Sequence, residues 1–257
     1  LHSINQNRIN AKNDKYNASS QTGNYIVVGS PSKPSTTNGK KVIIHVNKTI
    51  GSAAGNITNV ALRTGTWDTG TEVLVEVGTN GIIAGAGGDG GNGRNSASGL
   101  PGGDGTSGLG IEHQGTVINY RSGSLISAGF GGGGGGGGGR ETSKNDRRAG
   151  GGGGGGGAGF PFGVGGEGGT PQAGTRQANE DVGQDGGDAT EDTAGSGGSG
   201  GDNDDQAGGQ TGGDGGDNEQ NPAAGPNDDS LGGPAGANGA AIRVTSGVSF
   251  TFGTGAL

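Results

Sequence analysis

The sequence predicts a mostly irregular, polyglycine II fold. We expect a bundle of about ten packed left-handed polyglycine II helices, capped by a small β region of short strands and hairpins. Two observations lead to this prediction. The glycine runs 131–139 and 150–157 are uninterrupted, and elsewhere single non-glycine residues recur at every third position. Three residues per turn is the repeat of the extended left-handed helix, whereas a glycine-rich flexible linker has no reason to keep a period.

The period-three positions show where each helix belongs in the bundle. A helix with neighbours on every face tolerates no Cβ, while a helix at the edge can carry one side chain per turn. We therefore expect the two glycine runs at the centre and Gly-Gly-X segments around them, with substitutions at an outward position such as Asp214 tolerated. The X positions are Asp89 and Asn92; Val164, Glu167 and Thr170; Val182, Asp185 and Asp188; Ser196, Ser199 and Asp202; Thr211, Asp214 and Asp217; and Leu231, Pro234, Ala237 and Ala240.

Short β signals precede and interrupt the glycine-rich region. Stretches rich in Val and Ile and bounded by Gly, Pro, Asn and Thr are typical of strands. Such stretches lie at 25–28, 42–46, 59–62 and 72–77. A strand–turn–strand pattern that runs into glycine occurs at 75–84, again at 118–127 and more weakly at 242–250. We interpret the three copies as hairpins that form one β layer at an end of the bundle, and residues 1–23 as a polar tail.

Composition excludes several classes of protein. Only 26% of the residues are hydrophobic and 4% aromatic, too few for a large conventional core. There is no cysteine, so neither disulfides nor cysteine-based metal sites are possible. No apolar stretch of about 20 residues is present, so we expect no membrane insertion. The net charge of −8 argues against nucleic-acid binding. Because the first residue is Leu1, we expect a fragment or a processed product.

Polar, non-repeating stretches separate the glycine segments. If successive segments alternate in direction, five of these stretches fall at the end of the bundle away from the β layer. They are 94–98, 140–149, 171–181, 203–206 and 227–230. Dissimilar loops carried on a rigid scaffold are a common way to build a recognition surface.

This arrangement resembles the distal-tip adhesins of T-even-type bacteriophage long tail fibres. The resemblance rests on strand–turn–strand motifs running into Gly-Gly-Asp-Gly-Gly, followed by the two glycine runs split by 140–149, and it covers roughly 72–257. It implies a virion protein at the distal tip of the tail fibre that recognises a bacterial outer-membrane protein. Residues 72–257 would be the receptor-binding domain, and 1–71 an N-terminal region that connects to the rest of the fibre.

The resemblance assigns receptor binding to the five polar stretches. The residues themselves indicate no catalytic site, metal or cofactor. The candidate receptor-binding residues are Arg94, Asn95, Arg140, Glu141, Lys144, Asn145, Asp146, Arg147, Arg148, Gln172, Arg176, Gln177, Asn179, Asn203, Asp204, Asp205, Asn227 and Asp228.

Two alternative functions compete with this interpretation. A structural or ice-binding glycine-rich protein would repeat one small residue on a flat face, whereas the X positions here mix Asp, Ser, Val, Thr and Leu. A calcium-binding repeat protein would show a nine-residue period, whereas the period here is three. The scattered His2, His45 and His113 adjoin no nucleophile or ligand cluster, so the sequence indicates no enzyme.

Overall fold

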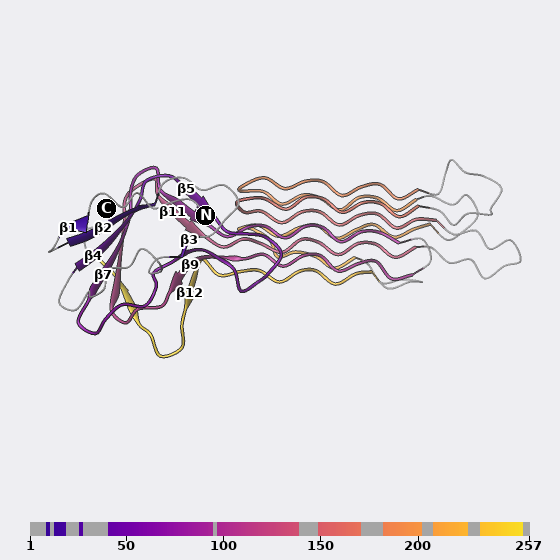
Figure 1. The fold of residues 1–257 in the computed structure, drawn as a ribbon. Helices are drawn as coiled ribbons and strands as arrows, with labels where there is room; N and C mark the ends of the chain where they lie inside the picture. The colour runs from indigo at the N-terminus through magenta and orange to yellow at the C-terminus, as the bar shows by residue number, and fades with distance from the viewer. Residues whose placement is uncertain are drawn as a thin grey trace, which may run out of the picture.

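The computed structural model describes the backbone of residues 9–10, 13–18 and 26–27. With side chains it describes 41–94, 97–138, 149–170, 182–201, 208–225 and 232–253. A β region lies at one end of the molecule, and extended glycine-rich segments project from it side by side (Figure 1). Within these ranges no helix occurs, and hence none that is long and apolar enough to cross a membrane.

The β region contains three sheets, which we name A, B and C. Sheet A has the strand order β1-β2-β4-β7-β10-β13, sheet B β11-β8-β5 and sheet C β12-β9-β6-β3. All described pairs are parallel except β1 with β2. The strands are β1 (Ile9–Asn10), β2 (Asn13–Ala18), β3 (Ile26–Val27), β4 (Lys41–Val46), β5 (Thr49–Gly51), β6 (Val60–Arg63), β7 (Glu72–Val77), β8 (Ile82–Ala84), β9 (Ser107–Ile111), β10 (Thr116–Tyr120), β11 (Leu125–Ser127), β12 (Ile242–Val244) and β13 (Phe250–Phe252).

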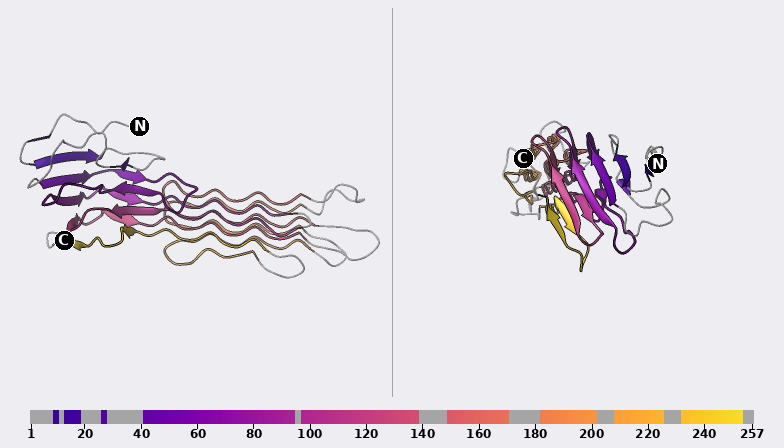
Figure 2. Two further views of the ribbon diagram at one scale, coloured as in Figure 1. Left: turned by 60° about the horizontal axis from the view of Figure 1, so that its bottom comes forward. Right: turned by 90° about the vertical axis from the view of Figure 1, so that its left-hand side faces the viewer.

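The chain winds through the sheets in a repeating order. It passes from A to B to C through β4, β5 and β6, then through β7, β8 and β9, and again through β10, β11 and β12 before β13 returns to sheet A. Corresponding strands of successive turns therefore stack in parallel (Figure 2). Each turn leaves the β region between its sheet B strand and its sheet C strand. These departures are 52–59, 85–106 and 128–241, and the two longer ones contain the glycine-rich segments.

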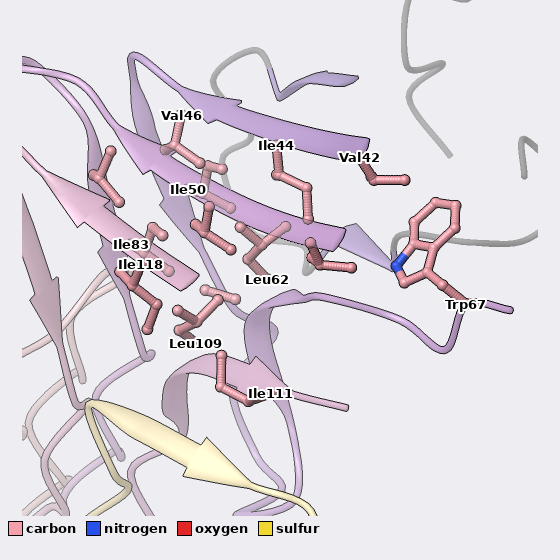
Figure 3. Close-up of a cluster of buried hydrophobic side chains, with 14 residues drawn as sticks. Val42, Ile44, Val46, Ile50, Leu62, Trp67, Ile83, Leu109, Ile111 and Ile118 are labelled. Atoms are coloured by element: carbon pink, nitrogen blue, oxygen red, sulfur yellow. The ribbon is translucent and has the colours of Figure 1, made fainter. Parts of the chain in front are cut away.

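Aliphatic side chains of the three sheets meet in one core. In β4 the burial alternates strictly, with Val42, Ile44 and Val46 fully buried, as expected for side chains that point to opposite faces of a strand. Ile50, Leu62, Ile83, Leu109, Ile111 and Ile118 complete the centre of the cluster (Figure 3). Of the scarce aromatic residues, Trp67 is buried at its edge and donates its Nε1–H to the carbonyl of Thr64 at 2.8 Å. Tyr120 and Phe162 are instead exposed.

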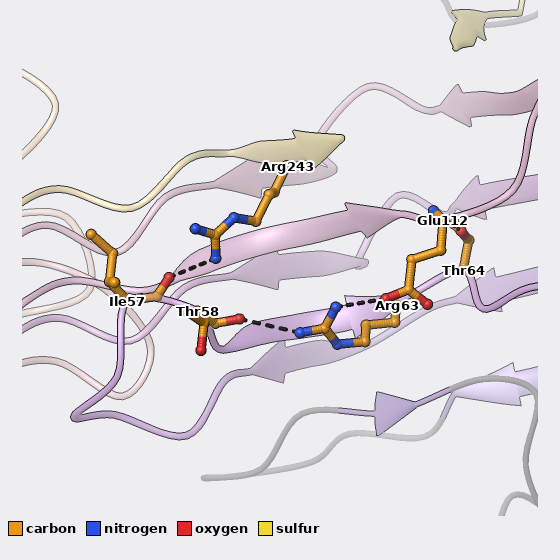
Figure 4. A network of polar contacts seen from close by, with 6 residues as sticks. All are labelled: Ile57, Thr58, Arg63, Thr64, Glu112 and Arg243. Atoms are coloured by element: carbon orange, nitrogen blue, oxygen red, sulfur yellow. Dashed lines mark hydrogen bonds and ion pairs between the residues drawn. The ribbon is translucent and has the colours of Figure 1, made fainter. Parts of the chain in front are cut away.

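A polar network crosses sheet C. Arg63 and Arg243 both lie in register with Gly110, which has no side chain between them. Arg63 forms an ion pair with Glu112 at 2.6 Å, and Arg243 donates to the carbonyl of Ile57 at 2.8 Å (Figure 4). Arg63 also donates to the carbonyl of Thr58 at 3.2 Å, so both arginines connect sheet C to the departure 52–59.

We call the glycine-rich segments the glycine array. They are extended and carry no secondary-structure element, and their backbones hydrogen bond to one another (Figure 1). The described parts of the array are 85–94, 97–106, 129–138, 149–158, 163–170, 182–189, 195–201, 208–216, 221–225 and 232–240. Its contacts repeat every third residue: a Cβ at Gly87, Gly90 or Gly93 would lie 1.9 Å from the carbonyl oxygen of Gly157, Gly154 or Gly151, respectively.

The two glycine runs lie at the centre of the array, as expected. Segment 129–138 hydrogen bonds to six others: 85–94, 97–106, 149–158, 208–216, 221–225 and 232–240. Segment 149–158 also bonds to six: 85–94, 129–138, 163–170, 182–189, 195–201 and 208–216. Every residue of 131–138 and of 149–158 is buried.

Asp and Asn side chains hydrogen bond to the backbone of neighbouring segments of the array. Where a backbone N–H has no carbonyl opposite it, a carboxylate or amide oxygen of the adjacent segment accepts its hydrogen bond. Asp104 accepts from Ala237 N–H at 2.8 Å, Asn238 from Gly131 at 2.9 Å and Asp214 from Gly197 at 2.8 Å. Asp214 was expected only to face solvent, so the sequence interpretation missed its structural role; for Asp104 and Asn238 it made no prediction.

Replacing Asp214 by valine should lower the free energy of unfolding by about 1 kcal/mol, because the Gly197 N–H loses its acceptor. Asp214→Asn keeps an acceptor oxygen, so its free energy of unfolding should fall by less than that of Asp214→Val. Urea denaturation of both variants measures the difference. Equal losses would show that the hydrogen bond does not stabilise the chain.

Asp217 caps a turn at the end of the array near the β region. Its carboxylate accepts hydrogen bonds from the backbone N–H groups of Glu219 at 2.8 Å, Gln220 at 3.0 Å and Ala194 at 3.1 Å. Burial by itself raises the pKa of this carboxyl, but the three hydrogen bonds outweigh burial and hold the pKa below its ordinary value of 3.8.

The lowered pKa predicts a pH dependence of stability. The stabilisation by ionised Asp217 is fully present above pH 3.8, the ordinary value, and is lost as the pH falls through the folded-state pKa. Wild type should therefore be more stable than Asp217→Asn at neutral pH, and the difference should shrink below pH 3.8. Urea denaturation at pH 7 and pH 3 tests this, and a constant difference would contradict it.

The predicted fold class is wrong. The structure has strands in three largely parallel sheets and no helix in the described residues, rather than a bundle of polyglycine II helices capped by hairpins. The tight turn that ends at Gly81 leads from sheet A into sheet B, so β7 and β8 do not pair with each other. The sequence copies pair with one another instead, β7 with β10 and β8 with β11. Residues 1–23, expected to be a tail, contain β1 and β2.

Candidate functional site

Five polar connections leave the glycine array at its end far from the β region. They are bounded by Arg94 and Ala97, Gly138 and Ala149, Thr170 and Val182, Gly201 and Gly208, and Gly225 and Gly232. We call the five connections, their ten bounding residues and the residues hydrogen bonded to these bounding residues the tip. The array positions the tip because its segments are extended and are hydrogen bonded to one another through their backbones (Figure 1).

Hydrogen bonds join the bounding residues of the first two connections. The N–H of Arg94 donates to the carbonyl of Gly136 at 3.2 Å, and the carbonyl of Arg94 accepts from Gly151 at 2.9 Å. The N–H of Gly138 donates to the carbonyl of Ala97 at 3.3 Å. The connections that start at Arg94 and at Gly138 therefore begin beside each other.

Residues at or next to the bounds of the other three connections are also hydrogen bonded at this end of the array. Gly183 donates to Gly169 at 2.9 Å, next to the bounds of the third connection. Gly201 donates to Gly150 at 2.8 Å and accepts from Gly209 at 2.8 Å, and Gly225 donates to Gly233 at 3.0 Å. Because the network passes through residues adjoining all five connections, the connections start and finish at one end of the array.

Of the eighteen residues predicted to bind a receptor, Arg94 is described. Its side chain is exposed, as a recognition residue requires, and its backbone joins the two central segments. The remaining candidates lie outside the described residues: Asn95, Arg140, Glu141, Lys144, Asn145, Asp146, Arg147, Arg148, Gln172, Arg176, Gln177, Asn179, Asn203, Asp204, Asp205, Asn227 and Asp228.

Gln210, two residues after the bounding Gly208, is a buried polar residue beside the tip that the sequence interpretation missed. Its N–H donates to the carbonyl of Gly137 at 3.0 Å, and its carbonyl accepts from Gly152 at 2.8 Å. The side chain is 9% exposed, and its Oε1 has no hydrogen-bond partner among the described residues. The residues three and six positions later in the same segment are Gly213 and Gly216, so a large side chain in a glycine row was the available signal.

The acidic and histidine side chains of the described residues are dispersed or engaged with the backbone. In the ranges given above, no group of three or more His, Asp or Glu side chains is placed to hold a metal ion. The outward carboxylates are engaged with backbone N–H groups, as at Asp214 and Asp217. His113, one of the candidate catalytic types, is buried with its Nε2 3.0 Å from the carbonyl oxygen of Thr71.

Comparison with known proteins identifies a family. A sequence model described as phage tail fibre adhesin Gp38 matches residues 6–255, almost the whole chain. A search of curated protein sequences finds no match. Among solved structures, the crystal structure of the gp37-gp38 adhesin tip complex of the bacteriophage S16 long tail fiber is similar, with 18% sequence identity and a TM-score of 0.39. The match covers 94% of this chain and 77% of that one.

Proposed function

Because the chain belongs to the phage tail fibre adhesin Gp38 family, we propose that it binds a receptor on the host bacterium through its tip. Family membership makes the chain a virion protein of the tail fibre. The family is one of adhesins and not a class of enzymes. The proposed receptor is a bacterial outer-membrane protein.

The observation that carries the proposal is the convergence of the five connections on one hydrogen-bonded end of the array. Their sequences are polar and differ from one another, whereas the array that carries them is repetitive. A rigid scaffold with dissimilar loops at one end suits recognition, because the loops can vary without altering the scaffold. The alternatives of an ice-binding, structural or calcium-binding protein account for neither the dissimilar loops nor the family.

Charge gives the proposed surface its specificity. Residues 140–149 carry Arg140, Lys144, Arg147 and Arg148 against Glu141 and Asp146, whereas 203–206 and 227–230 are acidic. Neighbouring patches of opposite sign suit the long extracellular loops of an outer-membrane barrel. Complementary potentials determine orientation and association rate more than affinity. We propose that the eighteen candidate residues contribute these contacts.

The chain also needs a connection to the virion. The similar solved structure is titled as a complex of gp37 with gp38 at the adhesin tip of a long tail fiber. We propose by analogy that this chain occupies the distal tip of its fibre and binds the preceding fibre protein. Residues 1–71 are the proposed attachment region, with 72–257 as the receptor-binding domain. In the structure, strands from both sides of residue 71 share the sheets, as β4 and β7 do.

Competition with the phage tests the receptor-binding function. Purified chain added to a susceptible strain should occupy the receptor and reduce phage adsorption in proportion to its concentration. Adsorption to cells that lack the receptor gives the background, and heat-denatured chain serves as the matched control. Undiminished adsorption at a saturating concentration of folded chain would reject the proposal.

A further inference from the structure

Most segments of the glycine array do not continue into a strand of the β region. Four of the ten described segments adjoin β8, β9, β11 or β12 directly: 85–94, 97–106, 129–138 and 232–240. The other six turn back at the end of the array near the β region, at 159–162, 190–193 and 217–220 (Figure 1). The third and fourth connections join only segments that turn back. A pull on either connection is therefore resisted by the bonds between segments, because the chain reverses before it reaches a sheet.

The bonds between neighbouring segments recur at several levels along the array. Segment 208–216 donates three backbone hydrogen bonds to 195–201, at 2.8 to 2.9 Å, and 182–189 donates two to 195–201, at 2.8 Å. The carboxylate of Asp214 adds a bond from Gly197 at 2.8 Å. These bonds join one segment to the next and so lie across the long axis of the array. A pull along the array therefore loads all the bonds of a segment together, whereas a pull across it loads them one after another.

Close packing adds a steric obstacle to sliding. If segment 208–216 moved toward the tip by one residue, Asp214 would take the position of Gly213. A Cβ at Gly213 would lie 2.0 Å from the carbonyl oxygen of Ala223. The obstacle is backbone, so the neighbouring segment has to move before the slide can proceed.

We propose that the array bears tension between the tip and the β region and that it is loaded in shear. A receptor that holds the tip while the virion moves pulls along the segments, so the bonds of a loaded segment have to break at once. Resistance to force is governed by the rate of unfolding, and breaking several bonds together raises that barrier. The inference rests on the proposed function only for the origin of the tension. The difference between pulling along and across the array belongs to the chain alone.

Single-molecule pulling between pairs of cysteines measures this difference, because the chain has no cysteine of its own. Val182 and Thr211 are exposed near the tip, and Glu219 is exposed in the turn 217–220 at the other end of the array. Between Val182→Cys and Glu219→Cys the chain runs along the array three times, so a pull on this pair shears three segments. A pull on Val182→Cys and Thr211→Cys acts across the same segments from one end and peels them apart. We expect the sheared pair to unfold at a force at least twice that of the peeled pair at one loading rate.

The two pairs are matched because they share Val182→Cys and differ in one exposed position. Both variants should keep the wild-type melting temperature, so that a difference in force reflects the direction of pulling. A second set with the exposed Gln184→Cys in place of Val182→Cys repeats the comparison. Equal forces in both sets, or a lower force for the sheared pair, overturn the inference.

Detachment of cells under flow tests whether the array carries load in the adhesin. Asp89 and Asn92 of segment 85–94, which adjoins β8, accept the N–H groups of Val164 at 3.0 Å and Glu167 at 3.1 Å. They connect a segment that turns back to one that continues into a strand. Beads coated with Asp89→Ala and Asn92→Ala chain should bind susceptible cells as wild type does at rest and detach at least twofold faster under flow.

The control for the flow experiment is Ser196→Ala with Ser199→Ala, at exposed outward positions of another segment. This variant should detach at the wild-type rate. Equal detachment of the two variants contradicts the transfer of load through Asp89 and Asn92. If wild-type beads do not bind cells at all, the proposed function is rejected, while the pulling experiment still decides whether the array resists shear.

Discussion

Gly154→Val is expected to lower the free energy of unfolding by at least about 3 kcal/mol, which is enough to unfold a marginally stable chain. Gly154 lies in segment 149–158, which has neighbours on six sides. A Cβ at this position would lie 2.2 Å from the carbonyl oxygen of Gly133. The obstacle is backbone, so a segment must move, and the bonds that Gly154 makes to Gly91 and Gly166 are lost with it.

Thr211→Val is the matched control for this substitution. It introduces the same side chain into the array at an exposed, outward position, where the expected change is within about 0.5 kcal/mol. Thermal and urea denaturation compare the two variants. Equal stability of Gly154→Val and Thr211→Val would contradict the close packing of the central segments.

Replacing 140–149 by a Gly-Ser turn is expected to abolish cell binding and to leave the fold intact. This stretch holds seven of the eighteen proposed receptor-binding residues: Arg140, Glu141, Lys144, Asn145, Asp146, Arg147 and Arg148. Gly138 at one bound keeps its hydrogen bond to the carbonyl of Ala97. Stability should change little, because the entropy of loop closure depends only weakly on loop length.

The control for this replacement lies at the opposite end of the array. Glu191→Gln with Asp192→Asn alters two exposed charges in the turn 190–193 without touching the tip. Binding of labelled protein to susceptible cells should be lost in the first variant and kept in the second. Wild-type binding by the Gly-Ser variant would place recognition outside the second connection.

The sequence predicted the positions of many strands but not how they pair. The stretches 42–46 and 72–77 are strands in the structure, and 59–62 overlaps the strand Val60–Arg63, because Val, Ile and Leu side chains of these stretches fill the core. The prediction of hairpins was wrong because a strand–turn–strand pattern does not reveal whether its two strands pair with each other or with the corresponding strands of the next copy. The strand Ser107–Ile111 was missed because two of its five residues are glycine and only Leu109 and Ile111 are large and apolar.

The central position of the glycine runs could be predicted, because the absence of side chains is itself a packing signal. The structural role of the outward carboxylates could not be predicted from the sequence. An Asp that faces solvent and an Asp that accepts the N–H of a neighbouring segment have the same spacing in the sequence. Only the structure shows that Asp89 faces Val164, 75 residues away. For the candidate site, the residue types could be predicted from the sequence, and the structure places the bounds of the connections at one end of the array.

Exchange of the five connections shows whether the tip recognises the receptor. The stretches 94–98, 140–149, 171–181, 203–206 and 227–230 are replaced by the corresponding stretches of a family member that binds a different host, and binding to both hosts is measured. If the tip recognises the receptor, the chimaera binds the second host and no longer binds the first, with a melting temperature close to that of wild type. If the folded chimaera still binds the first host and not the second, recognition lies on the array or the β region and not at the tip.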